Sequence, residues 1–415
     1  MRDDDTVSDT TTCAIVGGGP AGMVLGLLLA RAGVEVTVLE KHADFLRDFR
    51  GDTVHPTTLR LLDDLGLWPR FADISHSRLD HATVDVGAGR SVTMVDFRRL
   101  RQPHPYIAMV PQWDLLNLLA DAGRAEPTFT LRMSTEVTGV LREGSRVTGV
   151  RYETADGTGE LQADLTVACD GRGSLLREKT GLRTQEFPVG FDVWWFRLPR
   201  PETDEMYTLF PRLAPGRAMI VIPREGYLQI ALLIEKGTDA ALRARGLDAF
   251  HADVLALLPE AAGTVGSIAS LDEVKMLDVK LNRLRCWHIE GMLCIGDAAH
   301  AMSPAGGVGI NLAIQDAVAA ARLLAEPLRR GTVTGRDLAR VRRRRILPTV
   351  VTQALQRLID RRLLGPIVRG GSAGPSPGLI RTVERLPWLT VIPAYLVGVG
   401  VRPERAPGFA RRRPQ

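Results

Sequence analysis

The sequence predicts an α/β protein that combines a Rossmann-like parallel sheet, a separate antiparallel sheet and a helical C-terminal region. Three observations support this prediction. Residues 13–40 contain an apolar run, a glycine-rich turn, an apolar helical stretch and a second apolar run, which is the pattern of a βαβ unit. Residues 188–274 hold three strand candidates between Pro/Gly turns, an antiparallel signature. Residues 331–415 are Arg-rich and helical in pattern.

The individual elements follow from these patterns. Residues 13–16 suit a buried parallel strand, the helix of residues 21–32 ends at Gly33, and residues 34–39 form the next strand. Further along the chain we expect helices at 57–65, 112–125 and 311–328, paired strands within 132–150 around the turn 143–145, and strands at 161–168, 191–198, 217–222, 227–234 and 292–295.

Composition and charge exclude several classes of protein. The net charge is only +5, and the basic residues, of which five are lysines, are spread along the chain. The runs 342–345 and 411–413 fit a solvated helix face and a frayed terminus, with an acidic membrane or nucleic acid as the alternative partner. The acidic N-terminus is unlike a secretory signal, and no apolar stretch has the length of a membrane helix. We therefore expect a cytoplasmic protein.

The cysteines give no sign of a metal site. The chain has four of them, and they show no CxxC pairing: Cys13, Cys169, Cys286 and Cys294. Three lie in apolar strand-like runs, where a free cysteine behaves as a small hydrophobic residue. We therefore expect no bound metal.

The glycine turn Gly17-x-Gly19-x-x-Gly22 is the first motif that carries chemistry. The first glycine allows a tight strand-to-helix turn, the second lets the backbone approach a pyrophosphate, and the third permits close packing of the helix on the strand. Glu40 follows at the end of the second strand, where a carboxylate can accept both hydroxyls of a ribose. These residues predict a dinucleotide site, with the pyrophosphate at the helix N-terminus.

Two later segments distinguish the kind of dinucleotide. A strand runs into Asp170-Gly171, with Ser174 and Arg177 beyond it. A second strand ends in Gly296-Asp297 and is followed by the glycine-rich loop 303–311, which opens a helix. The free N–H groups of such a loop place partial positive charge beside whatever lies before it, as the N1 and O2 edge of a reduced flavin would require.

With these three motifs in this order, residues 13 to about 330 resemble the aromatic-ring flavoprotein monooxygenases, the para-hydroxybenzoate hydroxylase-like group A FAD-dependent monooxygenases. The resemblance implies FAD as cofactor and NADPH or NADH as co-substrate. It implies that the ADP half is held around Gly17, Gly19, Pro20, Ala21, Gly22, Glu40 and Lys41. It further implies cofactor contacts at Arg50, Gln112, Val137, Asp170, Asp297, Pro304, Gly307, Gly309, Ile310 and Asn311.

The resemblance also gives a domain plan for a chain that is long for a single core. We expect a disordered leader at 1–12, a discontinuous FAD-binding domain at 13–187 and 275–330, a substrate domain at 80–105 and 188–274, and a C-terminal helical region at 331–415.

The reaction implied by the resemblance is hydroxylation or epoxidation of an aromatic or other electron-rich small molecule, with secondary metabolism as one setting for it. In that family NAD(P)H reduces FAD, O₂ forms a flavin C4a-hydroperoxide, and one oxygen passes to the substrate. No catalytic side chain and no metal are required. The protein must exclude water and aim the substrate.

The substrate is expected between the flavin and the antiparallel layer. Strand alternation places Val193, Trp195 and Arg197 on one face and Trp194 and Phe196 on the other. A second pair of strand residues adds to the same cavity, either Met219 with Val221 or Gln229 with Ala231. The candidate walls are chiefly apolar, which indicates a lipophilic substrate.

Several alternatives remain open from the sequence alone. The scaffold also suits a flavin-dependent halogenase or dehydrogenase, although no Trp-x-Trp-x-Ile-Pro segment is present, or a non-catalytic flavin- or ligand-binding protein. His300 fits packing near the cofactor better than proton transfer. Arg177 serves the Asp-Gly motif or pairs with Glu178 or a helix end. Residues 386–401 fit a compact flap better than a membrane hairpin, because prolines and glycines interrupt them.

Overall fold

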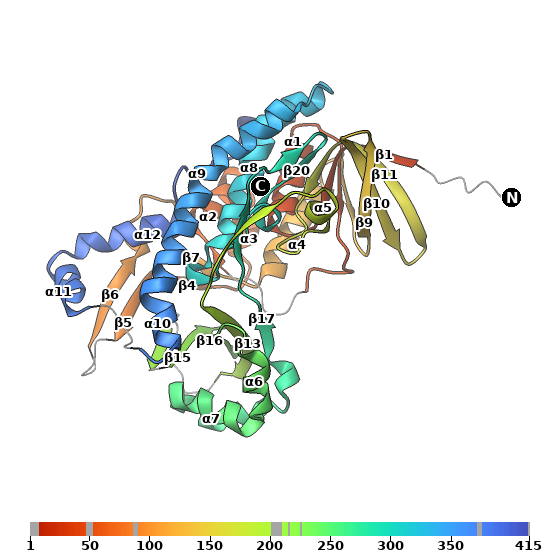
Figure 1. Cartoon of the computed structure of the whole chain (residues 1–415). Helices are drawn as coiled ribbons and strands as arrows, with labels where there is room; N and C mark the ends of the chain where they lie inside the picture. The colour runs from red at the N-terminus through yellow and green to blue at the C-terminus, as the bar shows by residue number, and fades with distance from the viewer. Residues whose placement is uncertain are drawn as a thin grey trace.

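A parallel-containing sheet forms the centre of the larger layer of the molecule (Figure 1). This computed structural model describes residues 8–46, 53–85, 90–200, 210–214, 216–224, 226–371 and 376–413. In the described residues the central sheet has the strand order β19-β20-β11-β1-β2-β8, with β10 and β9 continuing antiparallel beyond β11. Its strands are β1 (Ser8–Val16), β2 (Val36–Leu39), β8 (Phe129–Arg132), β9 (Glu136–Glu143), β10 (Arg146–Thr154), β11 (Gly157–Ala168), β19 (His288–Ile289) and β20 (Met292–Cys294).

The first strand begins earlier than the sequence predicts. Residues 8–12, expected in a disordered leader, belong to β1, which pairs in parallel with β11 from Ser8 opposite Glu160 onward. The long β11 extends far enough to supply backbone partners for this polar segment, and threonine suits an extended backbone. The expectation of disorder for residues 8–12 is therefore wrong.

Two buried helices cover the sheet. α1 (Pro20–Arg31) packs against α8 (Val308–Arg329) and α4 (Gln112–Arg124). The stretch 305–329 is long and apolar enough to cross a membrane, but 78% of its most apolar window is buried inside the protein. Its apolar character is thus explained by packing in the core, as for α1. Shorter helices α2 (Pro56–Asp64), α3 (Trp68–Ala72) and α5 (Leu175–Lys179) fill the connections.

The second layer is an antiparallel sheet, as the sequence predicts. Its strand order is β14-β15-β16-β13-β17, from β13 (Phe191–Pro199), β14 (Phe210–Ala214), β15 (Arg217–Pro223), β16 (Tyr227–Glu235) and β17 (Lys275–Leu277). The helices α6 (Asp239–Ala244) and α7 (Leu247–Leu257) lie at its outer side in Figure 1. Smaller sheets join the layers and are formed by β3 (Thr53–Val54), β4 (Ser77–Leu79), β5 (His81–Asp85), β6 (Ser91–Asp96), β7 (Ile107–Met109), β12 (Thr184–Phe187) and β18 (Leu281–Leu284).

The C-terminal region is helical and wraps around both layers (Figure 1). The long α9 (Gly335–Ile359) packs on α8 and continues through a π-helical turn into α10 (Gly365–Val368), which contacts β15 and β16. α11 (Pro377–Arg385) and α12 (Val391–Gly398) follow. α12 packs on β6 and on residues 97–99, so residues 386–401 form a compact segment against the body.

Candidate functional site

The predicted cofactor residues converge at one edge of the central sheet. Gly17 follows β1, Glu40 follows β2, Asp170 follows β11, and Asp297 lies just after β20. These four strands are parallel neighbours, so their carboxyl ends lie side by side. In open α/β sheets ligands bind beyond the carboxyl ends of the strands. The structure thus brings together residues that are up to 280 positions apart in the sequence.

The glycine turn has the geometry of a pyrophosphate cradle. Gly17 adopts φ +104°, and a Cβ there would lie 2.5 Å from the carbonyl oxygen of Cys169. A Cβ on Gly22 would lie 2.0 Å from the carbonyl oxygen of Gly17. A Cβ on Gly19, in contrast, would meet no protein atom within 4 Å. Two glycines therefore permit close backbone packing, while Gly19 leaves open space before the N-terminus of α1, where an anion is favoured.

Glu40 is fixed by the backbone around it. Its Oε2 accepts a hydrogen bond from the N–H of Gly18 at 2.8 Å, and its Oε1 accepts one from the N–H of His42 at 3.0 Å. The residue is only 5% exposed. These two contacts orient the carboxylate at the carboxyl end of β2. Lys41 beside it is exposed.

The Asp170 motif and the Asp297 motif are tied together by an arginine. Arg177 donates from Nη1 to the carbonyl oxygen of Ala298 at 3.0 Å and from Nη2 to that of Arg172 at 2.7 Å. Arg177 therefore binds the backbone beside the Asp170-Gly171 motif, which is one of the roles considered for it from the sequence. Asp170 accepts from the N–H of Leu176 at 3.2 Å, and burial raises the pKa of its carboxyl against the effect of its hydrogen bonds.

Asp297 lies at an accessible position with a cationic neighbour. Its Oδ2 is 3.4 Å from Nη2 of Arg172. The adjoining Gly296 packs close to α1 and α8, because a Cβ there would lie 3.4 Å from Cβ of Ala21 and 3.1 Å from Cβ of Ala313. Asp297 thus stands beside the first turn of α1, where one carboxylate can face a ribityl chain. Four residues of the following loop and helix start are half-buried: Pro304, Gly307, Gly309 and Ile310.

Residues 53–58 brace this loop, a role that sequence reasoning missed. Thr53 donates from Oγ1 to the carbonyl oxygen of Gly307 at 2.9 Å. Thr57 and Thr58 both donate to Oδ1 of Asn311, at 2.7 and 2.8 Å. The side chain of Asn311 therefore supports the loop. The sequence predicts a helix at residues 57–65 but gives no sign that its first threonines contact Asn311, which lies 254 and 253 positions further along the chain.

His55 belongs to the same brace and is fully buried. Its Nδ1 lies 2.8 Å from the carbonyl oxygen of Val397 in α12, and its Nε2 lies 3.0 Å from that of Gly307. A charged ring could donate to both oxygens and a neutral ring to only one. Burial nevertheless dominates and lowers the pKa of His55 to about 4, so the ring is neutral near pH 7.

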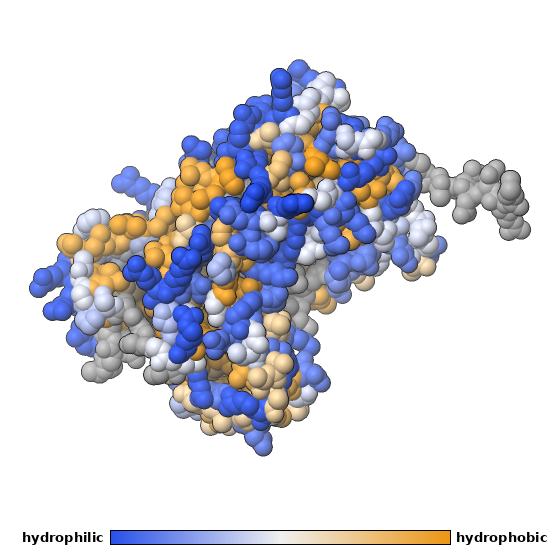
Figure 2. Space-filling view, in the orientation of Figure 1, coloured by the Kyte–Doolittle hydropathy of each residue, from blue (hydrophilic) through white to orange (hydrophobic). Residues whose placement is uncertain are grey.

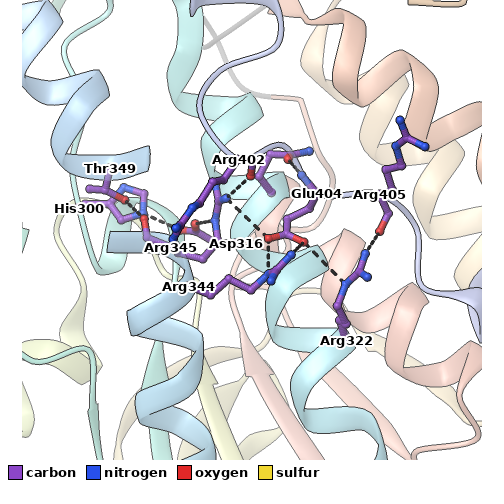
Figure 3. A network of polar contacts seen from close by, with 10 residues as sticks. His300, Asp316, Arg322, Arg344, Arg345, Thr349, Arg402, Glu404 and Arg405 are labelled. Carbon is purple, nitrogen blue, oxygen red and sulfur yellow. Dashed lines mark hydrogen bonds and ion pairs between the residues drawn. The ribbon is translucent and has the colours of Figure 1, made fainter. Parts of the chain in front are cut away.

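A buried ionic network supports the Gly296-Asp297 turn from the other side (Figure 3). Asp316 in α8 accepts from the N–H of Gly296 at 3.2 Å and contacts Nε2 of His300 at 2.5 Å. Its other oxygen accepts from Nε of Arg345 in α9 at 2.8 Å. Arg345 also lies 3.9 Å from Glu404. His300 is thus a structural residue at this site, as the sequence favoured, and not one that faces a substrate.

Glu404 anchors the C-terminal tail to the helices of the core. Its carboxylate is fully buried and receives Nε and Nη2 of Arg344 at 2.6 and 2.9 Å. Arg322 approaches it at 3.7 Å. Neither Asp316 nor Glu404 was singled out from the sequence, because a single acid within a helix or a tail carries no local signal of its partners.

The residues expected on the Trp195 face of the antiparallel sheet are partly wrong. The sequence offered Met219 with Val221 or Gln229 with Ala231 as companions of Trp195. Met219 and Val221 instead pack with Trp194 and Phe196 against α7. The register places Ala231 opposite Trp195 and Gln229 opposite Arg197, so the second pair shares their face. Ile220 and Ile222, one position away from the expected residues, also lie on it.

The remaining predicted positions are less informative. Gln112 is half-buried and opens α4, just after β7, which pairs with β3 of the brace. Val137 is a buried residue of the main core. Arg50 lies outside the described residues. In the part of the chain that the structure describes, no group of three or more His, Cys, Asp or Glu residues is arranged to hold a metal ion.

A cationic cleft adjoins the Asp297 turn. It has a volume of about 860 Å³ with its open mouth included. Arg172, Arg177, Lys236 and Lys280 line it, together with Glu186 and Asp278. Lys236 is engaged by Asp192 and Asp278, whereas the guanidinium of Arg172 links the cleft to Asp297.

A glycine turn with open space before α1, a buried acid after β2 and a braced glycine loop lie at one sheet edge, as in dinucleotide-binding flavoproteins. The chain belongs to the family described as FAD binding domain, which matches residues 9–354. It is 34% identical over 394 residues to 6-methylpretetramide 4-monooxygenase of Streptomyces rimosus, covering 91% of this chain and 90% of that protein. The protein is an FAD-dependent monooxygenase, as the sequence predicts.

Solved structures show the same fold. p-Nitrophenol 4-monooxygenase PnpA from Pseudomonas putida superimposes with a TM-score of 0.72 at 20% identity, covering 94% of each chain. The flavin-dependent brominase Bmp2 superimposes with a TM-score of 0.74 at 17% identity, covering 94% of this chain and 93% of that one. At such identities the likeness extends to the fold alone.

Proposed function

We propose that this monooxygenase uses NADPH or NADH to hydroxylate or epoxidise an aromatic or other electron-rich, lipophilic small molecule in the cytoplasm. The observation that carries the proposal is the convergence of Gly17, Glu40, Asp170 and Asp297 at one edge of the parallel sheet. The similarity to a 6-methylpretetramide 4-monooxygenase supports a substrate of that chemical class.

The residues at the sheet edge fit the separate parts of FAD. The open space at Gly19 before α1 suits the pyrophosphate, and Glu40 suits the adenosine ribose. Asp297 suits the ribityl chain, and the N–H groups that begin α8 suit the pyrimidine edge of the flavin. When bound, FAD supplies electron transfer from the nicotinamide and oxygen transfer to the substrate. The protein's part is to orient the reactants and exclude water.

The substrate contacts the face of the antiparallel sheet that carries Trp195. Trp195, Ile220 and Ile222 pack there with residues of α12 in an apolar cluster. Two buried donors on this face, Nε2 of Gln229 and Nε1 of Trp195, have no hydrogen-bond partner among the described residues. Buried donors are almost always paired in native proteins. A carbonyl or phenolic oxygen of a largely apolar substrate would satisfy them.

The charge of the cationic cleft supports a binding site for the nicotinamide dinucleotide there. A nicotinamide dinucleotide carries phosphates, and Arg172, Arg177 and Lys280 line a cleft that begins at the Asp297 turn. Charge complementarity of this kind raises the local concentration of an anionic reactant. Lys280→Ala should therefore raise the KM for NAD(P)H more than the KM for the aromatic substrate.

The deciding experiment follows oxidation of NADPH and of NADH by the purified FAD-loaded protein, with and without candidate phenols and polycyclic aromatics. The expected result is substrate-stimulated oxidation with one atom of ¹⁸O₂ recovered in the product. Release of H₂O₂ alone would contradict productive oxygen transfer to that candidate. Halide-dependent formation of a halogenated product would favour a halogenase on this scaffold. Failure of both nicotinamides to reduce the flavin would overturn the proposal.

A further inference from the structure

The C-terminal region differs from the rest of the chain in charge. Residues 331–415 contain 17 arginines, no lysine and four acidic residues, which gives a net charge of +13. The preceding 330 residues therefore carry −8 of the total of +5. Only a minority of these arginines have acidic partners, chiefly Arg340, Arg344 and Arg345. The positive charge of the chain is thus concentrated in its C-terminal region.

The same region presents most of the large apolar side chains that are exposed to solvent. Seven of the ten such residues in the described chain lie between positions 347 and 395. We call six of them the C-terminal apolar surface: Leu358, Leu379, Leu386, Trp388, Ile392 and Tyr395. Figure 2 shows this surface as an apolar band over α11, α12 and α9, bordered by hydrophilic side chains. Trp388 is the most exposed of the six, at 56%.

The band is continuous between the helices that carry it. A groove of about 420 Å³, with its open mouth included, lies between α9 and α12. Val351, Leu355, Ile359 and Leu396 line it, together with residues of the loop 303–311. α11 and α12 both contact the turn that carries Trp388. Exposed apolar areas of this kind on a folded protein mark an interaction site.

Four arginines border the C-terminal apolar surface. Arg361 and Arg362 follow Leu358 by three and four positions, and Arg381 and Arg385 lie on α11. All four are exposed, and within the described chain none forms an ion pair. An apolar surface with exposed Trp and Tyr, bordered by unpaired arginines, is the arrangement of helices that lie in a membrane interface.

We propose that the C-terminal apolar surface docks this enzyme on an anionic lipid surface. α11 and α12 are nine and eight residues long, so they can lie on a bilayer but cannot span it. The aromatic and aliphatic side chains enter the headgroup region while the arginines contact lipid phosphates. A second copy of the chain is a poorer occupant, because a two-fold interface would oppose two surfaces of the same positive charge.

The test is co-sedimentation of the FAD-loaded full-length protein with vesicles, which requires no turnover. Vesicles of phosphatidylcholine mixed with phosphatidylglycerol should bind the protein at low salt and release it at high salt. Vesicles of phosphatidylcholine alone should bind it far more weakly. Each arginine near such a surface contributes on the order of five-fold to partitioning, so replacing Arg361, Arg362, Arg381 and Arg385 by Gln should weaken binding at least a hundred-fold.

A charge-matched control distinguishes the surface from net charge. It replaces four exposed arginines of the FAD-binding domain by Gln: Arg70, Arg124, Arg183 and Arg285. This variant should bind anionic vesicles nearly as well as the original chain. Trp388→Ser should weaken binding without changing flavin content. In the original chain, the emission of Trp388 should account for any blue shift on binding.

Any of four results would overturn the proposal. The first is that the original chain stays in the supernatant with anionic vesicles at low salt. The second is equal loss of binding in the two arginine variants, which would show a general charge effect. The third is that substitutions in the C-terminal apolar surface convert an oligomer to monomers without affecting vesicle binding, which would identify a second copy as the occupant. Capture of an acidic protein at this surface, with no vesicle binding, would overturn it as well.

Discussion

Asp316 and His300 form a contact of 2.5 Å between Oδ2 and Nε2, and neither side chain is more than 1% exposed. Burial by itself would disfavour the carboxylate, but His300 and Arg345 hold the pKa of Asp316 below its usual value. The same carboxylate accepts a hydrogen bond from the N–H of Gly296. Asp316, a residue of α8, therefore fixes the turn that carries Asp297. The cofactor site is therefore supported by a residue that does not face the cofactor.

Asp316→Asn should destabilise the protein strongly. The substitution removes the charge 2.8 Å from the buried Arg345 and leaves it only Glu404, at 3.9 Å. Breaking a buried ion pair in this way costs about 3–5 kcal/mol. A large fall in melting temperature and loss of FAD on gel filtration are expected. The control is Asp121→Asn, whose partners Arg70 and Arg124 are exposed and whose effect should stay below about 1 kcal/mol. Similar melting temperatures for the two variants would contradict the role assigned to Asp316.

The buried His55 predicts a loss of stability in mild acid. Its pKa in the folded protein is about 4, against about 6.5 in an unfolded chain. Between these values the unfolded state binds more protons, so stability falls as the pH is lowered from 6.5 to 4, by about 3 kcal/mol in total. Melting temperatures measured across this range should show the fall.

The matched test removes the titrating group. His55→Gln should be less stable at pH 8, because a buried contact between Gly307 and α12 is altered, yet its pH dependence between 6.5 and 4 should be flatter. His81→Gln, at a partly exposed position beside Asp80, serves as the control for loss of a histidine outside the brace. An unchanged slope in the His55 variant would show that other groups control acid stability.

The glycines of the cofactor turn should separate folding from binding. Gly22→Ala would place a Cβ 2.0 Å from the carbonyl oxygen of Gly17, so it should lower the melting temperature of the apoprotein. Gly19→Ala meets no protein atom within 4 Å, so the apoprotein should keep its stability while the Kd for FAD rises ten-fold or more. Titration of apoprotein with FAD, followed by flavin fluorescence, measures this difference. Tight FAD binding by Gly19→Ala would place the pyrophosphate elsewhere.

Asp297→Ala should weaken FAD retention while leaving the fold intact. The side chain is partly exposed and its contact with Arg172 is long, at 3.4 Å, so little stability depends on it. Flavin content after dialysis and the rate of reduction by NADPH should both fall. Asp272→Ala, at an exposed site of the substrate domain, serves as control. Full FAD occupancy and an unchanged reduction rate in the Asp297 variant would refute the assignment of this loop.

Substitutions on the two faces of the antiparallel sheet should have opposite effects on stability and on KM. Met219→Ala removes a fully buried side chain from the core beneath α7 and should cost about 2–5 kcal/mol with little change in KM. Gln229→Leu removes a buried donor that has no partner in the described chain, so stability should hold or rise. Its KM for the aromatic substrate should rise several-fold. A raised KM for Met219→Ala alone would reverse the two faces.

The sequence by itself determined the local features of this protein. The glycine turn, the acid at the end of β2, the order of the three motifs and the antiparallel character of residues 191–235 depend on neighbours within a few residues, where backbone sterics and side-chain periodicity act. The same local patterns end two predicted strands at Asp170 and Asp297, and the family resemblance implies that both residues contact the cofactor. The resemblance carried by the three motifs implied FAD as the cofactor, which the family relationship confirms.

Only the tertiary structure decided which distant residues meet. Strand alternation tells which residues of one strand share a face, but the register between strands fixes which faces coincide, and it placed Ile220 beside Trp195 where Met219 was expected. The brace of residues 53–58, the Asp316 network and the anchoring of Glu404 join segments more than 80 residues apart or on separate helices. Such pairings arise from packing of whole elements, and no local pattern encodes them.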